Sequence, residues 1–356
     1  MADAALHWRL LEDGIEDPFL HFAVEETLLR RVAEGRSAAT LRLRHTVPSV
    51  WIGVYQDPRE DVDLAYCQAR GLPVVRRPNP GGAVYQDRGT FCTSAFFPRN
   101  PTFQSLGIRE TRELYALQGA VVEGLCARLG VRAQAAPVND VLVEGRKIYG
   151  SAQIELGDGV AHSGTFLVHA DLEAMAAALC PSRLKYAHRD FTSVRERVVN
   201  LSEAAGRPLP IRAVMDLFVA VLQERWPVRL EPGGLTGEER QEAESLYREK
   251  YARAEWTFPA RRPFTTSLAT RAASGVVLLE LAMEGDRIRS LAIQGDFLLE
   301  RQDDLAVFLQ ASAGLRIPEA IELLRQGSLP ADVMGALAHL LSQGAQRPAS
   351  TGREQP

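Results

Sequence analysis

The part of this chain that decides its fold is the run RRPNPGGAVYQD at residues 76–87, followed some sixty positions later by NDVLVEGRKIYGSA at residues 139–152. The first run joins two apolar stretches through a loop with two arginines and two adjacent glycines. The second places one lysine, Lys147, between glycines at the edge of a predicted strand. Glycines beside a cation let a ligand approach the backbone closely. Together the two runs predict a site for a phosphate and an acyl carboxylate.

Length and composition limit the class of protein. The 356 residues exceed a typical single domain, so we expect two domains of unequal size. A hydrophobic share of 46% is ordinary for a globular protein, and a formal net charge of -4 gives no electrostatic reason to expect a nucleic acid partner. No apolar run reaches bilayer-spanning length and no signal-peptide core begins the chain, so we expect a cytoplasmic protein with no membrane partner.

The four cysteines are widely spaced and form no C-x-x-C pair; they are Cys67, Cys92, Cys126 and Cys180. In a reducing compartment we expect free structural thiols and no zinc site. A catalytic cysteine is the less favoured alternative, because none lies beside a histidine or at a predicted helix start.

Apolar periodicity predicts a mixture of helices and strands without strict alternation. Helices are predicted over residues 18–33, 63–70, 109–129 and 172–179, strands over residues 40–44, 49–55, 72–75, 90–97 and 165–169, and a hairpin over residues 141–149. The run 49–55 is continuous and β-branched, which is typical of a buried central strand. The predicted fold class is α+β with a large mixed sheet.

A turn-rich stretch at residues 231–235 marks the end of the first domain. The predicted division is a large domain over residues 1–235, a charged linker helix over 236–258, a small α+β domain over 259–345 and a disordered tail over 346–356. In the small domain, strands are predicted over residues 276–283 and 287–294, and helices over 304–311 and 318–326. The polar composition that predicts disorder already begins near residue 343.

The Gly81-Gly82 pair has two interpretations. Glycines expose backbone N–H groups to a phosphate, and Arg76 and Arg77 would supply complementary charge. Alternatively, the two neighbouring prolines make the segment a rigid connector. The segment has neither the Walker spacing G-x-x-x-x-G-K-[ST] nor the helix that follows a Rossmann G-x-G-x-x-G. The residues alone leave both interpretations open.

Lys147 also has two interpretations. It can place a compact positive charge on a phosphate or a developing oxyanion, or it can be a surface residue of a hairpin. Upstream, Asn139 and Asp140 form either a turn or an amide and a carboxylate that contact a nucleotide or Mg²⁺. His162-Ser163 imitates a nucleophile beside its base, but neighbours in sequence do not adopt triad geometry, which disfavours a hydrolase.

Taken in order, these segments resemble the lipoate–protein ligases of the biotin/lipoate ligase and lipoyl/octanoyl transferase superfamily. Residues 76–87 are similar to the family's R-R-x-S-G-G-G-A-V-x-H-D segment, and residues 139–152 to its N-D and G-x-K-x-x-G-S-A segments. Residues 250–258 are similar to the start of its accessory domain. The resemblance covers nearly the whole chain and implies a large mixed-sheet catalytic domain of the biotin/lipoate ligase type with a smaller α+β C-terminal domain.

The resemblance implies a two-step reaction. Lipoate and ATP, with Mg²⁺, form lipoyl-adenylate, and the acyl group then moves to a lysine of a lipoyl domain in a 2-oxoacid dehydrogenase E2 subunit or in the glycine cleavage H protein. Lys147 would contact the acyl carbonyl and α-phosphate, Arg77 the nucleotide or phosphate, and Asn139 and Asp140 the phosphate or Mg²⁺. The adenylate pocket would be lined by backbone groups of Gly82, Ala83, Val84 and Tyr85.

The chain departs from the family pattern at three places near the predicted site. Asn79-Pro80 stands where the family has Ser-Gly, Gln86 where it has the His of H-D, and Ser163 where it has the second His of H-H-G-T. These changes bear on the choice of acyl chain and on the activation step. The apolar residues that could line the acyl tunnel, or equally pack in the core, are Val50, Ile52 and Val75.

Two alternatives to an ATP-dependent ligase stand beside it. An ATP-independent octanoyl or lipoyl transferase would use a cysteine nucleophile through a thioester. The stretch where one such subgroup carries that cysteine reads QAAPV here, at residues 134–138, which counts against this alternative. A non-catalytic homologue that binds lipoyl-adenylate or an acceptor domain is the third hypothesis.

Overall fold

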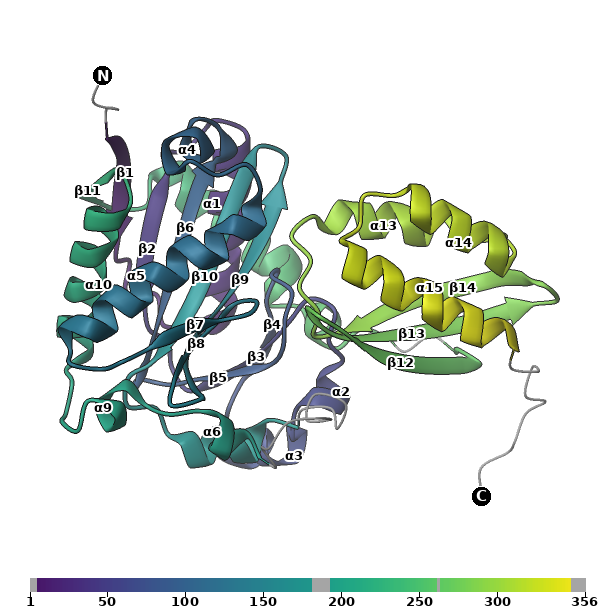
Figure 1. Cartoon of the computed structure of the whole chain (residues 1–356), viewed down its shortest axis with the longest axis horizontal. Helices are drawn as coiled ribbons and strands as arrows, with labels where there is room; N and C mark the ends of the chain where they lie inside the picture. The colour runs from purple at the N-terminus through teal and green to yellow at the C-terminus, as the bar shows by residue number, and fades with distance from the viewer. Residues whose placement is uncertain (1–4, 181–192, 261–262, 347–356) are drawn as a thin grey trace.

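A mixed eight-stranded sheet forms the centre of the larger, N-terminal part of the computed structural model, which describes residues 5–180, 193–260 and 263–346 (Figure 1). The strand order is β11-β1-β2-β6-β10-β9-β8-β7, with parallel pairing only among β11, β1 and β2. The strands are β1 (Leu6–Leu11), β2 (Thr40–Arg44), β6 (Thr90–Pro98), β7 (Gln134–Ala136), β8 (Asp140–Val143), β9 (Arg146–Leu156), β10 (Gly159–Leu167) and β11 (Val228–Gly233). The predicted α+β class with a large mixed sheet is confirmed.

A second, three-stranded sheet lies beside the large one, in the order β4-β3-β5. Its strands are β4 (Val74–Arg76), β3 (Ser49–Ile52) and β5 (Val84–Gln86), and the helices α2 (Pro58–Asp61) and α3 (Leu64–Arg70) connect β3 to β4. The prediction of a buried central strand is confirmed for β3. The strand is shorter than expected, because the chain turns after Ile52 into a loop that contacts Gly81.

Helices cover both faces of the large sheet. The side chains of β6 point alternately to one face and to the other, so each face buries a different set of them. Phe91 and Phe97 belong to the main apolar cluster with the helices α5 (Leu114–Arg128) and α10 (Ile211–Arg225). Phe96 and Cys92 face the other side, towards α1 (Pro18–Ala33). The remaining helices of this region are α4 (Arg99–Leu106), η1 (Thr111–Glu113), α6 (Leu172–Ala178), α8 (Val194–Arg197) and α9 (Leu201–Ala204).

Helix α1 has the predicted bounds, because local capping fixes its start. Asp17 accepts a hydrogen bond from Phe19 N at 2.8 Å, and Pro18 occupies the first turn. The predicted helix over residues 109–129 was too long at its N-terminal end. Its first turn is the short η1, and α5 begins only at Leu114.

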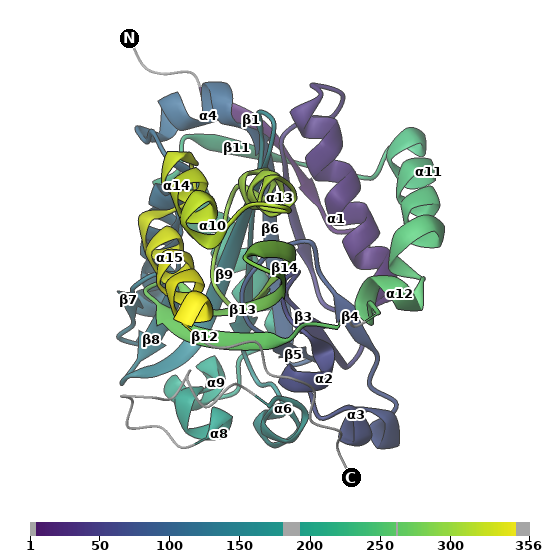
Figure 2. The same ribbon diagram turned by 90° about the vertical axis from the view of Figure 1, so that its right-hand side faces the viewer.

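The linker consists of α11 (Gly237–Leu246), the π-helical turn η2 (Tyr247–Tyr251) and α12 (Ala254–Thr257), and it packs along α1 (Figure 2). Arg9 on β1 forms a two-pronged ion pair with Glu239, at 2.7 and 2.8 Å. Lys250 and Tyr251 both donate to Glu26 Oε2, at 2.6 and 2.5 Å. The linker is therefore docked on the large domain by buried charge pairs.

The Glu239 pair predicts acid sensitivity of this docking. Burial alone would raise the pKa of Glu239, but hydrogen bonds from Arg9, Ser37 and the Thr236 N–H lower it from 4.5 to about 2. A carboxylate with a depressed folded-state pKa stabilises the fold above its unfolded pKa, and the contribution is lost as pH falls from about 4.5 to about 2. We expect the difference in urea midpoint between wild type and Glu239→Gln to be largest above pH 5 and to shrink below it. The exposed Glu244→Gln gives the control, and a pH-independent difference would contradict the prediction.

The C-terminal elements form a sheet covered by helices, which we call the accessory domain. Its elements are β12 (Thr266–Ala272), β13 (Gly275–Glu284), β14 (Arg287–Gly295), α13 (Gln302–Ala311), α14 (Ile317–Gln326) and α15 (Ala331–Gln346). The four predicted elements are present, whereas β12 and α15 were missed. The structure corrects the predicted onset of disorder near residue 343, since residues 343–346 lie in α15; residues 347–356 lie outside the described residues. The domain boundaries 1–235, 236–258 and 259–345 stay predictions.

The accessory domain touches the large domain close to the 76–87 segment. Tyr55 stacks on Phe297 with ring centroids 4.9 Å apart, and its carbonyl accepts from Gly295 N at 2.9 Å. Gln302 Nε2 donates to the Pro78 carbonyl at 2.7 Å. These contacts place accessory-domain residues at the rim of the site described next. Within the described ranges, no helix has both the length and the apolar character needed to cross a bilayer.

Candidate active site

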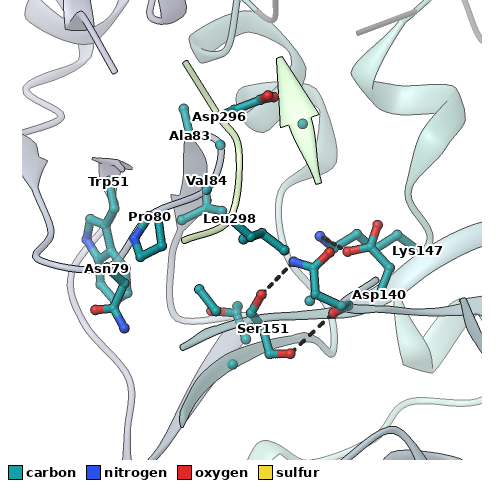
Figure 3. A pocket seen from close by; sticks show the side chains of 18 of the residues that line it. Trp51, Asn79, Pro80, Ala83, Val84, Asp140, Lys147, Ser151, Asp296 and Leu298 are labelled. Atoms are coloured by element: carbon teal, nitrogen blue, oxygen red, sulfur yellow. Dashed lines mark hydrogen bonds and ion pairs between the residues drawn. The ribbon is translucent and has the colours of Figure 1, made fainter. Parts of the chain in front are cut away.

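One pocket brings the two decisive sequence segments together. It lies on the α1 side of the large sheet, and its wall contains the 79–85 loop, residues 137–140 and Lys147. Figure 3 shows Trp51, Asn79 and Pro80 on one side and Asp140, Lys147 and Ser151 on the other. The accessory domain adds Asp296 and Leu298 to the wall. The juxtaposition expected from the sequence is therefore present.

The floor of the pocket is a row of residues that cross the sheet in register. Arg44 pairs with Cys92, Cys92 with Thr165, Thr165 with Gly150 and Gly150 with Asp140. Directly paired residues point to the same face of a sheet, and all five line the pocket. Four strand spacings of about 4.8 Å separate the ends of this row, which is about 19 Å. The pocket is therefore elongated, with Asp140 at one end and Arg44 at the other.

Lys147 is held at the Asp140 end. Its Nζ lies 2.6 Å from Asp140 Oδ1, and Arg197 Nη2 lies 3.3 Å from Asp140 Oδ2. The lysine side chain folds back over Gly150, where an added Cβ would lie 2.1 Å from Nζ. The side chain of Lys147 keeps 25% of its surface exposed, so this end is open to solvent. A cation is thus fixed in position at the pocket mouth and remains accessible to a ligand.

Asn139 joins the β8 side of the site to β9. Its Nδ2 donates to the Ser151 carbonyl at 2.5 Å, and its carbonyl accepts from Ser151 N at 3.0 Å. This clamp fixes the start of β8, and with it the position of Asp140. The nucleotide contact expected of Asn139 stays a prediction.

Arg77 lines the pocket, but its guanidinium is enclosed by the loop that follows it in the chain. Its guanidinium donates to the carbonyls of Trp51, Pro80 and Gly82 at 3.2, 3.0 and 2.8 Å. Burial lowers the pKa of Arg77 to about 10. Arg77 therefore shapes the 79–82 loop from within, and direct contact with a nucleotide stays a prediction.

The loop itself depends on close backbone approach. Gly81 has φ of +100°, a conformation that favours glycine, and a Cβ on Gly53 would lie 2.0 Å from the Gly81 carbonyl oxygen. Asn79 Nδ2 is buried and has no hydrogen-bond partner among the described residues. A buried donor in a pocket wall without a protein partner is available to a ligand acceptor. This donor occupies the position where the family pattern has serine.

The structure corrects the role expected of Arg76. Its side chain is not in the pocket wall, and it donates to carbonyls on two separate segments: Gly53, Val54 and Gln56 in the β3–α2 loop, and Trp256 and Thr257 in the linker. Burial lowers the pKa of Arg76 to about 10. Arg76 therefore joins the linker to the loop that supports Gly81.

We expect Arg76→Lys to destabilise the protein by about 3 kcal/mol, because a lysine cannot replace the forked set of donors and several buried carbonyls lose their partner. The shift of the urea midpoint measures this loss. The exposed Arg70→Lys is the matched control and is expected to change stability by less than about 0.5 kcal/mol. Equal stability of the two variants would contradict the role assigned to Arg76.

Of the two alternatives for Val50, Ile52 and Val75, packing in the core is the one that the structure shows. Val50 and Ile52 are fully buried on the face of the small sheet that packs against α3 and α6. Val75 is fully buried in the cluster that contains Phe22 and Trp51. None of the three lines the pocket. Because side chains alternate along β3, the residue that faces the pocket is Trp51. Phe22 of α1 supplies a second aromatic wall.

Several pocket residues were missed from the sequence. Glu25, Arg44 and Thr165 line it, together with Ser163, which had been noted only as a departure from the family pattern. One available signal was the alternation of Arg42 and Arg44 in an otherwise apolar strand, which is unusual for buried positions.

Side chains point alternately to the two faces of the sheet along β10, and this excludes the disfavoured hydrolase interpretation of His162-Ser163. Ser163 faces the pocket, whereas His162 is buried on the opposite face, 3.0 Å from Gln153 Oε1 and in edge contact with Tyr115. Burial lowers the pKa of His162 to about 3. This histidine is a neutral core residue and cannot act as a base for Ser163.

Comparison with known proteins identifies the family. The model of the lipoyl protein ligase A/B catalytic domain matches residues 17–223. The chain is 31% identical over 277 residues to the octanoyltransferase LipM of Kyrpidia tusciae, covering 70% of this chain and 98% of that protein. It is 27% identical over 288 residues to lipoate–protein ligase 1 of Staphylococcus aureus, covering 80% and 83%.

Solved structures agree with this match. An archaeal bipartite lipoate–protein ligase from Thermoplasma acidophilum superposes with a TM-score of 0.63 at 26% identity, over 73% of this chain and all of that chain. Lipoate–protein ligase A bound with ATP gives a TM-score of 0.61 at 25% identity, over 71% and 99%. Plasmodium falciparum LipL1 shares the fold over 96% of this chain and all of that chain, with a TM-score of 0.74 at 18% identity.

The fold, the lysine-bearing pocket and the family match define an enzyme of protein lipoylation. The chain belongs to the lipoate–protein ligase and octanoyltransferase family. Both ligases and a transferase are among its relatives, so membership alone does not specify the acyl donor.

Proposed function

We propose that this protein is an ATP-dependent lipoate–protein ligase, which converts lipoate and ATP to lipoyl-adenylate and transfers the lipoyl group to a lysine of a lipoyl domain. The observation that carries the proposal is the single pocket in which Lys147 lies opposite the glycine loop of residues 79–85. A fixed cation facing a loop with accessible backbone groups suits a phosphate and a developing oxyanion. The likeness to a ligase structure bound with ATP supports the same chemistry.

In the first step, a carboxylate oxygen of lipoate attacks the α-phosphorus of ATP. The bond from the α-phosphorus to the bridging oxygen breaks, and pyrophosphate leaves. The ammonium of Lys147 would lie between the carboxylate and the α-phosphate and neutralise charge on both as the new bond forms. Backbone groups of residues 82–85 would hold the adenylate, since β5 is an edge strand of the small sheet.

In the second step, the neutral ε-amine of the acceptor lysine attacks the acyl carbon. The bond from that carbon to the phosphate oxygen breaks, AMP leaves, and the amine loses a proton. Lys147 would stabilise the oxyanion on the acyl carbonyl. The partly exposed position of Lys147 at the pocket mouth supports access by an acceptor domain from outside.

Mg²⁺ would arrive with ATP. Asp140 had been the possible metal ligand, but its two carboxylate oxygens pair with Lys147 and Arg197. Within the described ranges, no group of three His, Cys, Asp or Glu side chains could hold a metal ion. We therefore assign the ion chiefly to the phosphates of the substrate, which Mg²⁺ commonly shares with one or two carboxylates, and Asp140 stays the predicted carboxylate.

The acceptor would be a lipoyl domain of a 2-oxoacid dehydrogenase E2 subunit or the glycine cleavage H protein. A structural neighbour is described together with its E2 lipoyl domain, which supports the first of these.

The four cysteines are all free thiols, in keeping with the expected cytoplasmic location.

The second candidate, an ATP-independent transferase, is favoured by the 31% identity to an octanoyltransferase. It requires a thiol nucleophile. Residues 134–138 hold no cysteine, and of the four cysteines only Cys92 lines the pocket. Burial raises the pKa of the Cys92 thiol, and this residue lies two strands from β9, near the closed end. These features favour the ligase.

The decisive experiment supplies pure protein with ATP, Mg²⁺ and lipoate, follows pyrophosphate, and measures the intact mass of an added lipoyl domain. A parallel reaction offers octanoyl-carrier protein without ATP, using wild type and Cys92→Ser. Pyrophosphate release and lipoylation that need ATP and survive Cys92→Ser support the proposal. ATP-free transfer that Cys92→Ser abolishes would establish the transferase. Lipoyl-adenylate binding without any transfer would establish a non-catalytic homologue.

A further inference from the structure

A short stretch of the accessory domain, residues 295–302, lies against the large domain, and we call it the docking segment. Two backbone hydrogen bonds cross between the domains here. The Glu155 N–H on β9 donates to the Glu300 carbonyl at 2.8 Å, and the Gly295 N–H donates to the Tyr55 carbonyl at 2.9 Å. Like the aromatic stack described above, these bonds join uncharged groups. The docking segment is therefore held largely by neutral contacts.

The side chain of Glu300 places a carboxylate in the middle of these neutral contacts. The residue is 7% exposed, and in the ranges that the structure describes no donor forms a hydrogen bond with its buried Oε1. Arg112 on η1 is a nearby cation, but its Nε lies 3.8 Å from Oε1, too far for a hydrogen bond, and its side chain is 46% exposed. The Glu300 carboxylate is therefore buried with weak compensation.

The other titratable groups near Glu300 do not stabilise its charge. Glu155 on β9 and Asp332 on α15 are carboxylates, and the hydroxyl of Tyr115 on α5 is buried. Burial is the largest cause that raises the pKa of Glu300, and the two carboxylates add to it. The backbone N–H of Glu300 and the guanidinium of Arg112 oppose it. Glu300 thus holds its proton more tightly when the segment is docked than it would in water.

This preference sets the direction of a proton dependence. A group whose pKa is raised on docking favours the docked arrangement when it is protonated and opposes that arrangement once it is ionised. The charge of Glu300 therefore has no effect on docking well below pH 4.5, its ordinary pKa, and its full effect above the raised pKa. At neutral pH the ionised side chain opposes the neutral contacts of the docking segment.

The docking segment also forms part of the pocket wall. Leu298 lines the pocket, and a Cβ added to Gly81 of the glycine loop would lie 3.3 Å from Leu298 Cδ2. The Leu298 N–H donates to the carbonyl of Ser274, which lines the pocket as well. Separation of the docking segment from the large domain would therefore remove part of this wall.

We propose that Glu300 is a proton-sensitive release switch between the two domains: its ionised carboxylate weakens the docking of residues 295–302, and its neutral acid permits tight docking. A buried charge without full compensation costs free energy, which water restores when the segment separates. Arg112 moderates this cost because it is the cation beside the carboxylate. The switch does not depend on which acyl donor the enzyme uses.

The test measures hydrogen exchange of the whole protein without any substrate, by mass spectrometry resolved to single amides. The reporters are the N–H groups of Glu155 and Gly295, which bond across the domains. At pH 7 we expect Glu300→Gln to slow exchange at both reporters by about tenfold, because a neutral amide of the same size replaces the buried charge. At pH 4 the two proteins should exchange alike, since Glu300 is then protonated when docked.

An internal reference makes the wild-type protein informative by itself. The Val199 N–H donates to the Lys147 carbonyl at 3.0 Å, inside the large domain, and its exchange should not depend on Glu300. We expect the exchange rates of the two reporters, relative to that of Val199, to fall in wild type as pH falls from 7 to 4. This comparison still tests the switch if Glu300→Gln does not fold.

Two further variants separate the charge from its position. Arg112→Gln removes the nearby cation, so we expect exchange at the reporters to become about two- to fivefold faster at pH 7. The same change should have no effect when Glu300→Gln is already present. Glu284→Gln is the matched control, because Glu284 is exposed and lies at the opposite end of β13 and β14 from Gly295. We expect this control to exchange as wild type does.

Three results would contradict the switch. The first is unchanged or faster exchange of the reporters in Glu300→Gln at pH 7. The second is a difference that persists at pH 4, and the third is an equal effect of Arg112→Gln with and without Glu300→Gln. The ligase proposal fails separately, because hydrogen exchange requires no turnover. Pyrophosphate release with unchanged reporters would leave the ligase and remove the switch, and the reverse result would remove the ligase and leave the switch.

Discussion

Lys147→Ala is expected to lower kcat for pyrophosphate release with lipoate by about 10²–10³-fold, the usual cost of removing one preorganised donor to a developing charge. The effect should fall on kcat more than on KM, because the interaction strengthens as charge develops. Asp140 keeps Arg197 as a partner in this variant, so the fold is expected to persist. Stopped-flow or coupled pyrophosphate assays, with the urea midpoint measured in parallel, check both statements.

Two further variants make the Lys147 result specific. Gly150→Ala retains the lysine but puts a Cβ where its Nζ now lies, so we expect nearly the same loss of rate through displacement. Arg146→Ala removes the adjacent cation, which pairs with Glu203 outside the pocket, and is the matched control with near wild-type rate. Full activity of Lys147→Ala would remove the central residue of the proposed mechanism.

Gly53→Ala is expected to have the second largest effect. The added Cβ would lie 2.0 Å from the Gly81 carbonyl oxygen, and backbone on both sides leaves no flexible side chain to yield. The 79–82 loop must move, and a displacement of about 1 Å near the reacting groups can cost about 10²-fold in rate. We expect kcat/KM for ATP to fall by that order and stability to fall by about 1–3 kcal/mol, as for overpacking. Initial rates at varied ATP and urea titration measure the two effects.

The control for Gly53→Ala is Gly234→Ala, where no atom lies within 4 Å of the added Cβ and φ is not positive. This variant is expected to keep wild-type kinetics and stability. A Gly53→Ala protein that binds and turns over ATP normally would show that the loop has no role in holding the nucleotide.

Local patterns in the sequence predicted those parts of the fold that local interactions determine. The bounds of α1 were predicted because capping by Asp17 and Pro18 lies next to the helix. The β8–β9 hairpin was predicted because Glu144 and Gly145 adopt the positive φ angles that its turn requires. Strand β12 was missed because only two of its residues, Leu268 and Ala272, are apolar and buried, a weak signal that the pairing with β13 completes.

The sequence alone determined the α+β class, the resemblance to a family and the pair of segments that meet at Lys147, because periodicity and motif order are written along the chain. Only the tertiary structure decided which groups those segments meet. Arg76 and Arg77 are simply two cationic residues in the sequence, but hydrogen bonds to the carbonyls of distant residues, Val54 and Trp51, make them supports of the 79–82 loop. Arg44 reads as one basic residue in a strand, and cross-strand register places it at the buried end of the pocket. The identity of a neighbour across a sheet depends on register between distant segments, which no local pattern specifies.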